Sequence, residues 1–343
     1  MTEVSVLGAT GMVGQRFVSL LANHPFFRIA ALFASEKRKG LKYGETVNWV
    51  LEEDIPESVK NIELRALGEE VPTKIVFSAL PASIAGGIEK ELAENGHYVF
   101  SNASAHRYDE FVPIIVPEVN PGHFEAVKYQ NTKGFIITNP NCSTAGIVIP
   151  LKAIKDTLGI KKLVVFTMQA VSGAGYPGVP SLGIIDNIIP HIEKEEDKIK
   201  TETRKILGDF SGKFEYADFK VEARCNRVPV RNGHTEVLFI ETDKKADVSE
   251  LKEILKNFSA LPQKLNLPTA PKNPIIVKDD KFRPQPVLDR NAGKGMAVTV
   301  GNIRKADIFD FTLTVLSHNT IRGAAGGSVL NAELFLKDGK LEV

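Results

Sequence analysis

Two side chains from distant parts of the chain have the types needed for thiol chemistry. Cys142 lies in "TNPNCSTAG", between Asn141 and Ser143, where an apolar strand gives way to a largely apolar helix. A cysteine reacts as its thiolate, and a helix N-terminus favours the thiolate. Backbone N–H groups there, with the Asn141 amide, could stabilise an oxyanion formed at a carbonyl. This position predicts a nucleophile.

A thiol of this kind needs a general acid/base, and His234 is the candidate. It follows Asn232-Gly233 and starts a strand. His318 abuts the C-terminal turn, where we expect it to cap or pack. The other five histidines fall in loops or beside helices, where we expect surface positions: His24, His97, His106, His123 and His191. The second cysteine, Cys225, lies within a strand and is interpreted as a small buried residue.

A glycine-rich turn near the N-terminus predicts a dinucleotide site. In "VSVLGATGMVGQRFVSLL", Gly8, Gly11 and Gly14 lie between a strand and a helix, where glycine allows close approach of a pyrophosphate. The spacing, GxxGxxG, departs from the usual GxGxxG. After the second strand, Ser35 and the basic stretch Lys37–Lys39 favour NADP over NAD, although Glu36 lies between them. A thiol beside a nicotinamide suggests interconversion of a thiohemiacetal and an acyl-enzyme.

The order of elements predicts an α/β protein with two domains. Short apolar strands and helical stretches alternate through the first third, which indicates an N-terminal Rossmann-like, doubly wound parallel sheet. The middle of the chain is rich in strands, with a hairpin signal at Asn232-Gly233, which indicates an α+β catalytic and dimerisation domain. At 343 residues the chain is long enough for two cores.

Composition narrows the function classes. Lys+Arg 43 against Asp+Glu 42 gives a net charge of +1, so we expect neither nucleic acid nor a membrane surface as partner. Two cysteines in 343 residues make no disulfide framework, and the N-terminal residues do not have the pattern of a signal peptide. We therefore expect a cytoplasmic protein, and we expect no metal.

Seven motifs resemble one enzyme family over essentially the whole chain. They are "GATGMVGQRFV", "SNASAHR", "NPNCSTAG", "MQAVSGAGYPGVPS", "TETRKIL", "CNRVPVRNGHTE" and "HNTIRGAAGGSVLNAE". Together they resemble aspartate-β-semialdehyde dehydrogenase in its archaeal and fungal-like branch. The resemblance implies reversible, NADP-dependent reductive dephosphorylation of L-4-aspartyl phosphate to the semialdehyde, in lysine, methionine and threonine biosynthesis. It also implies an NADP-binding domain of residues 1–141 and 319–343, and a catalytic and dimerisation domain of residues 142–318.

The resemblance also assigns roles to residues. Cys142 matches the acyl-forming nucleophile, His234 the acid/base and Gln169 the residue that orients the substrate. Arg227 matches the partner of the substrate carboxylate, Glu202 that of the ammonium, and Arg107 and Lys205 those of the phosphate. We assign a further set to the cofactor: Gly8, Thr10, Gly11, Met12, Val13, Ser35, Arg38, Ser78, Leu80, Ser172, Gly173, Pro190 and Asn319.

Two geometric expectations accompany these roles. On a helical wheel, Glu202 and Lys205 flank an apolar stripe through Ile199 and Ile206, so both could reach out from one flank. Residues 193–200 are interpreted as a solvated, Lys/Glu-rich helix. A two-residue turn at Asn232-Gly233 would put Arg227 and His234 on one face but roughly 13 Å apart along the strand. We therefore expect Pro229 to bend the chain.

Other functions remain open, some with the same thiol chemistry and one without catalysis. Malonyl-CoA reductase resembles the same family, but the amino-acid clamp would then have no purpose. N-acetyl-γ-glutamyl-phosphate reductase is more distant, because its substrate has a blocked amine. A redox-sensing NADP-binding regulator without catalysis is an alternative of another class. It would need the glycine turn but not Cys142 at a helix start together with His234 and Gln169. The resemblance further implies a homodimer or homotetramer formed through the catalytic domain.

Overall fold

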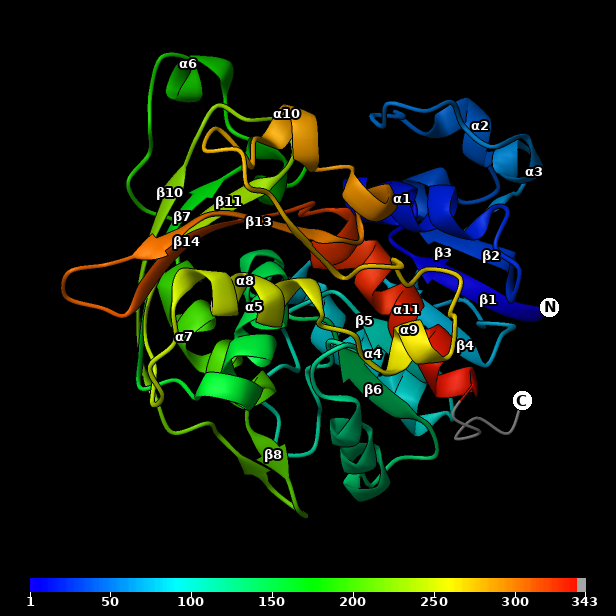
Figure 1. The fold of residues 1–343 in the computed structure, drawn as a ribbon. Helices are drawn as coiled ribbons and strands as arrows, with labels where there is room; N and C mark the ends of the chain where they lie inside the picture. Colours follow the sequence, from blue (N-terminus) through cyan, green and yellow to red (C-terminus); the bar gives the residue numbers. More distant parts are fainter. Residues whose placement is uncertain (338–343) are drawn as a thin grey trace.

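Two six-stranded sheets organise the protein, and the structure, a computed structural model, describes residues 1–337 (Figure 1). The first sheet has the order β3-β2-β1-β4-β5-β6, and all of its strands are parallel. Its strands are β1 (Thr2–Leu7), β2 (Phe27–Ala34), β3 (Leu64–Ala66), β4 (Ile75–Ser78), β5 (Tyr98–Ser101) and β6 (Phe135–Thr138).

The second sheet is mixed and has the order β10-β7-β11-β14-β13-β12. Its strands are β7 (Lys162–Gln169), β10 (Lys220–Arg227), β11 (His234–Glu241), β12 (Ile275–Val277), β13 (Val298–Lys305) and β14 (Phe311–Ser317). A small ribbon pairs β8 (Asp209–Phe210) with β9 (Phe214–Glu215). The two sheets confirm the predicted fold class.

Eleven α-helices are present in the described residues. They are α1 (Met12–Leu21), α2 (Tyr43–Thr46), α3 (Glu57–Lys60), α4 (Ala82–Glu94), α5 (Cys142–Leu158), α6 (Ser181–Ile184), α7 (Glu195–Ile206), α8 (Val248–Lys256), α9 (Leu261–Lys264), α10 (Pro286–Asp289) and α11 (Gly326–Lys337). Short 3-10 segments occupy Glu36–Arg38, Pro121–Tyr129, Val171–Ala174 and Ala292–Gly295, and a π turn occupies Ile321–Ala325. None of the described helices is long and apolar enough to cross a bilayer.

Helices cover both faces of the first sheet, as a doubly wound fold requires. The apolar side of α1 packs with α11 in one core, through residues such as Phe17 and Leu330. The opposite core contains Val76 of β4 and Ala85 of α4. Helix α11 thus joins the core of the first sheet although it follows the last strand of the second. Residues 338–343, the end of the predicted NADP-binding domain, lie outside the described residues.

Strands β10 and β11 do not form a hairpin, so that prediction is wrong. Each pairs with β7, β10 in parallel on one side and β11 antiparallel on the other. The chain from Val228 to Gly233 therefore crosses the end of β7. A two-residue turn cannot form here, because β10 already ends at Arg227, just ahead of Pro229. The connection to β11 is therefore longer than the predicted turn. The expected bend of the chain at this proline is confirmed, because the backbone bends at Pro229.

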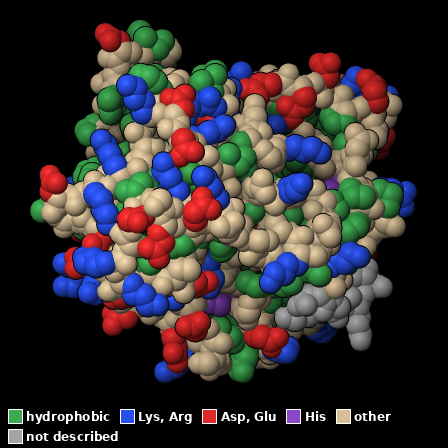
Figure 2. All heavy atoms as spheres, viewed as in Figure 1, with side chains coloured by type: hydrophobic (Ala, Val, Ile, Leu, Met, Phe, Trp, Pro, Cys, Tyr) green, Lys and Arg blue, Asp and Glu red, His purple; other side chains and the backbone are tan. Residues whose placement is uncertain are grey.

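One face of the second sheet is covered and the other is partly open. Helices α5, α7 and α8 pack on the covered face, through residues such as Ile147, Ile199 and Leu251. On the other face the apolar side chains of Phe166 and Met168 are 42% and 37% exposed. The loop around α6 protrudes beside this sheet and carries further apolar side chains at the surface (Figures 1 and 2).

The surface mixes charges of both signs on the face drawn in Figure 2. The histidines are less exposed than predicted. His24, His106 and His123 are buried, and only His191 among the five is exposed. Each buried ring has polar partners that local sequence did not reveal. His24 Nε2, for example, lies 2.7 Å from a carboxylate oxygen of Glu333 on α11. Cys225 is buried, as predicted.

Candidate active site

A cavity of about 820 Å³ lies where the two sheets meet. Its lining includes Arg38, after β2, and Cys142, at the start of α5. The N-terminus of α1 also lines it. The cavity therefore joins the predicted nucleophile to the predicted dinucleotide turn.

Cys142 is the first residue of α5, and Asn141 is its N-cap. The Asn141 side-chain oxygen accepts hydrogen bonds from the N–H groups of Ser143 (3.0 Å) and Thr144 (3.2 Å). Its amide nitrogen donates to Glu195 Oε1 at 2.7 Å. This capping fixes the thiol at the helix terminus. That Asn141 donates to an oxyanion stays a prediction.

His234 lies against the thiol. Its Nε2 is 3.0 Å from Cys142 Sγ, and its Nδ1 accepts a hydrogen bond of 3.0 Å from the N–H of Ala170. Because a backbone N–H donates to Nδ1, the neutral ring carries its proton on Nε2, facing the sulfur. The structure thus brings together the two residues that were predicted to act as nucleophile and acid/base.

Arg227 approaches the same point from the other side of β7. Its Nη1 donates to the carbonyl oxygen of Ala170 at 2.9 Å. A Cβ on Gly173 would lie 2.7 Å from that Nη1 and 3.1 Å from His234 Cε1, so a larger residue there would displace the guanidinium. Gln169 is buried at the end of β7 and pairs in register with Arg227, but it does not line the cavity.

Burial favours the uncharged forms of both Cys142 and His234. Burial raises the pKa of the Cys142 thiol to about 12; the Glu195 charge adds to this, and Arg227 and Arg107 oppose it. Burial, with the Arg227 charge next, lowers the pKa of His234 to about 3. A helix N-terminus contributes about 1 kcal/mol, and each pKa unit corresponds to about 1.4 kcal/mol. Desolvation therefore outweighs the helix terminus, which still favours the thiolate but by the smaller amount.

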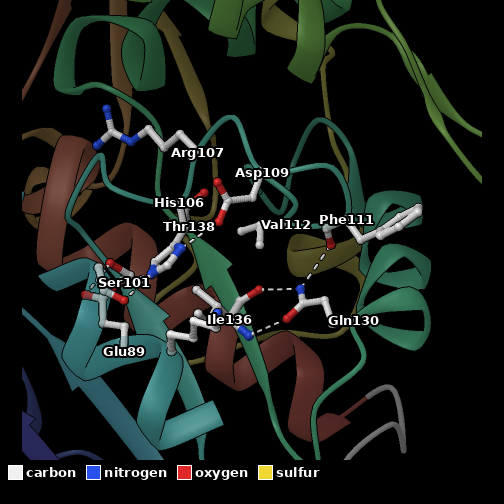
Figure 3. A network of polar contacts seen from close by, with 12 residues as sticks. Glu89, Ser101, His106, Arg107, Asp109, Phe111, Val112, Gln130, Ile136 and Thr138 are labelled. Atoms are coloured by element: carbon white, nitrogen blue, oxygen red, sulfur yellow. Dashed lines mark hydrogen bonds and ion pairs between the residues drawn. The ribbon is translucent and has the colours of Figure 1, made fainter. Parts of the chain in front are cut away.

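Arg107 is carried by a loop between β5 and β6 that is held by a polar network (Figure 3). His106 Nδ1 lies 2.7 Å from Asp109 Oδ2, and its Nε2 lies 3.1 Å from the carbonyl oxygen of Gly86. Further along the loop, Gln130 donates to the carbonyl oxygen of Phe111 at 3.0 Å. The Arg107 side chain points away from this network and reaches the cavity.

Glu202 and Lys205 are both buried, so the expectation that they reach out from a flank of α7 is wrong. Glu202 Oε1 accepts from Arg107 Nη1 at 2.9 Å, and its Oε2 accepts from the Asn141 N–H at 2.5 Å. Lys205 Nζ donates to the carbonyl oxygens of Arg107 (2.8 Å) and Val112 (2.9 Å). The reason is that their partners lie on the Arg107 loop and at the start of α5, which a helical wheel cannot place.

Glu195 and Lys198, which sequence reasoning missed, do line the cavity. They lie in the stretch interpreted as solvated helix, yet Glu195 is only 5% exposed. The signal was available: each precedes Glu202 or Lys205 by seven residues, which is two helical turns and hence the same face. Gly323 was also missed. A Cβ there would lie 2.8 Å from Cys142 Cβ.

The residues around the glycine turn fit a dinucleotide. Helix α1 begins without a side-chain cap, so its first N–H groups are free to bind a pyrophosphate. Arg38 suits a 2′-phosphate beyond the ribose. Nine of the predicted cofactor residues line the cavity: Thr10, Gly11, Met12, Val13, Arg38, Leu80, Ser172, Gly173 and Asn319. Gly8, Ser35, Ser78 and Pro190 do not line it: Gly8 is partly buried, Ser78 is buried, and Ser35 and Pro190 are exposed.

Family models cover most of the chain. "Semialdehyde dehydrogenase, NAD binding domain" matches residues 3–127, and "Semialdehyde dehydrogenase, dimerisation domain" matches residues 151–322. The aspartate-semialdehyde dehydrogenase of Archaeoglobus fulgidus is 51% identical, with 98% of each chain covered.

Solved structures of the same kind of enzyme resemble this fold over nearly the whole chain. That of aspartate semialdehyde dehydrogenase with NADP from Candida albicans has a TM-score of 0.92 and 41% identity, covering 99% of this chain and 100% of that one. The Vibrio cholerae aspartate semialdehyde dehydrogenase II complexed with ASA has a TM-score of 0.81 and 28% identity, covering 98% and 99%.

Replacing Gly323 by Ala should displace Cys142 and lower kcat/KM at least about tenfold, because a misplaced nucleophile loses its attack geometry. The matched control is Gly87→Ala in α4, where no atom lies within 4 Å of the new Cβ. Steady-state kinetics with circular dichroism would check this. Equal activity of both variants, with the fold retained, would contradict the close packing described.

Alkylation of Cys142 by iodoacetamide should keep accelerating up to about pH 10, because a raised thiol pKa leaves little thiolate at neutral pH. The rate is measured by mass spectrometry on the unliganded protein. Cys142→Ala is the control, and it should stay unlabelled because Cys225 is buried. A plateau near neutral pH would show that the thiol ionises more easily than its burial implies.

Proposed function

Because the chain belongs to the aspartate-semialdehyde dehydrogenase family, we propose that it interconverts L-4-aspartyl phosphate and L-aspartate-4-semialdehyde with NADP. The observation that carries this proposal is the 3.0 Å approach of Cys142 Sγ, which lines the dinucleotide cavity, and His234 Nε2. The relatives' names support the activity, and with it a place in the biosynthesis of aspartate-derived amino acids.

In the reductive direction the Cys142 sulfur bonds to the β-carbonyl carbon of the acyl phosphate, the bond from that carbon to the phosphate oxygen breaks, and the thiol proton leaves with the phosphate. When bound, NADPH supplies the hydride that reduces the resulting thioester. His234 presents Nε2 to the oxygen that gains charge and exchanges a proton there. The resulting thiohemiacetal on Cys142 then breaks down to release the semialdehyde. The Ala170 N–H keeps the imidazole ring directed at these atoms.

The charged groups of the substrate match cations that line the cavity. Arg227 is suited to the α-carboxylate, since a guanidinium binds a carboxylate through two hydrogen bonds. Arg107 is suited to the phosphate. The contacts of Glu202 and Lys205 support a revised role for both: they position Arg107, rather than contacting ammonium or phosphate themselves. Gln169, buried beside Arg227, remains a proposed orienting residue on resemblance alone.

The domain division proposed from the sequence follows this arrangement. Residues 1–141 and the segment from residue 319 would bind NADP, and residues 142–318 would carry catalysis and dimerisation. Arg38 supports NADP rather than NAD, and the Candida albicans relative is described with NADP. The two unpaired cysteines suit the proposed cytoplasmic location.

We propose a homodimer, or a tetramer built from it, through the partly open face of the second sheet. Phe166 and Met168 of β7 are exposed there, and Leu182 in the protruding loop is 93% exposed. Contiguous exposed apolar side chains are typical of protein interfaces. The match to a dimerisation domain over residues 151–322 supports this surface.

The activity is tested by NADP reduction with L-aspartate-4-semialdehyde, with and without inorganic phosphate. We expect phosphate-dependent reduction, lost at least about 10³-fold in Cys142→Ala because the nucleophile is removed. NADP binding, followed by fluorescence titration, should survive in that variant. No reduction, together with NADPH oxidation by malonyl-CoA, would move the assignment to a malonyl-CoA reductase. NADP binding without either turnover would favour a regulator.

The interface is tested by a Phe166→Asp/Met168→Asp double variant. Two charges in an apolar contact should shift the protein to the mass of one chain in size-exclusion chromatography with light scattering. The matched control is Leu41→Asp in the first domain, an exposed apolar side chain far from that sheet. If the double variant keeps the mass of the unmodified protein, the assembly uses another surface.

A further inference from the structure

Glu236 is a buried acidic side chain that the proposed mechanism does not use. It lies on β11, two residues after His234, and is 0% exposed. Successive side chains of a strand point to opposite faces, so Glu236 faces the same way as His234 and as Leu238, which belongs to the core beneath α5. Along the strand, the carboxyl group therefore lies between that apolar core and His234.

The surroundings of this carboxyl group suit its neutral form. Within residues 1–337 neither of its oxygens has a well-formed hydrogen bond. A buried carboxylate needs a cation or several donors to offset its lost hydration, whereas a neutral acid does not. Burial accordingly raises the pKa of Glu236 well above its ordinary value, and the nearby Ser143 hydroxyl opposes this only in part. A protonated carboxyl group has both an O–H donor and an acceptor.

The Ser143 hydroxyl is the candidate partner of that acid. Ser143 follows Cys142 directly at the start of α5, and its buried Oγ likewise has no hydrogen bond in the part of the chain that the structure describes. The helix approaches the sheet closely here. A Cβ on Gly146 would lie 2.4 Å from Ser317 Oγ, and Ser317 pairs with His234 in register. A change in this packing would therefore move Cys142 relative to His234.

Ionisation of Glu236 would work against the nucleophile. Burial is the main cause of the raised pKa of the Cys142 thiol, and a negative charge on Glu236 adds to it. A neutral acid has no such effect, yet it can still exchange a hydrogen bond with a hydroxyl group.

We propose that Glu236 works as a neutral carboxylic acid that positions the start of α5, and with it the Cys142 thiol, against His234. Its partner in this role is the Ser143 hydroxyl. Glu236 does not line the cavity, so it is a positioning residue and touches neither substrate nor cofactor. The proposal rests on the proposed function, because it concerns the geometry of the nucleophile in that reaction.

The test compares Glu236→Gln with Glu236→Leu. An amide keeps a donor and an acceptor without charge, whereas leucine has neither. Glu236→Gln should keep kcat within about threefold of that of the unmodified enzyme. Glu236→Leu should lower kcat at least about tenfold, because a displaced nucleophile loses its attack geometry. The KM values for the semialdehyde and NADP should change less than about twofold. The thermal unfolding midpoint of Glu236→Leu should not fall, since an apolar side chain replaces a buried polar group.

Equal loss of kcat in Glu236→Gln would overturn the role of the neutral acid, and an active Glu236→Leu would overturn the positioning role. A loss of activity that only accompanies a lower unfolding midpoint would mark a merely structural effect and overturn it too. If Glu236→Leu does not fold, Ser143→Ala removes the partner alone and should lower kcat at least about threefold. The matched control is Thr157→Val, which removes a hydroxyl near the other end of α5 and should behave like the unmodified enzyme.

Infrared difference spectroscopy gives a readout without turnover. At neutral pH the unmodified protein should show the carbonyl band of a protonated carboxylic acid that Glu236→Gln lacks. Ser143→Ala should shift that band, because the acid loses its hydrogen-bond partner. If the unmodified protein shows no turnover, the proposed function fails, while the band still decides the state of Glu236. A missing band, or one that Ser143→Ala leaves unshifted, would overturn the proposal.

Discussion

The backbone of Ala170 is the point on which the arrangement of the site depends. Its N–H donates to His234 Nδ1, and its carbonyl oxygen accepts from Arg227 Nη1. Ala170 follows directly after β7, the strand that separates β10 from β11. One short stretch of main chain therefore sets both the tautomer of the base and the direction of the guanidinium. Since these are backbone groups, their positions follow from the sheet and not from any side chain at residue 170.

Buried ion pairs hold the loops around the cavity against the segments that carry Cys142 and its neighbours. Glu202 links Arg107, on a loop of the first sheet, to the N–H of Asn141 at the start of α5. Similarly, Arg322 pairs with Glu118 through two hydrogen bonds of 2.6 and 2.9 Å, and Gly323 next to it packs on Cys142. Breaking a buried pair costs about 3–5 kcal/mol. These pairs therefore resist movement of the loops that form the cavity walls.

The same burial that organises the site also keeps its reactive pair neutral. The raised pKa of the thiol and the lowered pKa of the imidazole both disfavour transfer of the thiol proton to the ring. Arg227 acts on both groups: it opposes the rise in the pKa of the thiol and adds to the fall in that of the imidazole. The charged ends of a bound substrate and cofactor would therefore alter both groups together, because they meet the same cations in the same low-dielectric cavity.

Sequence alone determined the features that depend on neighbouring residues. The parallel sheet of the first domain follows from alternating apolar strands and helices, the glycine turn from its spacing, and the position of Cys142 at a helix start from Asn141 and Pro140. Such patterns are encoded within one or two turns of chain. Position after Asn232-Gly233 made His234 a candidate, and the resemblance then gave it a role and named Arg227. Tertiary structure decided how they meet, by inserting β7 between β10 and β11 where a local turn signal suggested a hairpin.

The tertiary structure also decided which charged side chains of α7 face the cavity. Glu195 and Lys198 share a helix face with Glu202 and Lys205, and a helical wheel cannot distinguish them. Only the packing of the Arg107 loop over the second pair buries it and leaves the first pair at the cavity. The burial of His24, His106 and His123 was hidden for the same reason, since their partners include groups far along the chain or in other elements. Long-range polar contacts leave no periodic trace in sequence.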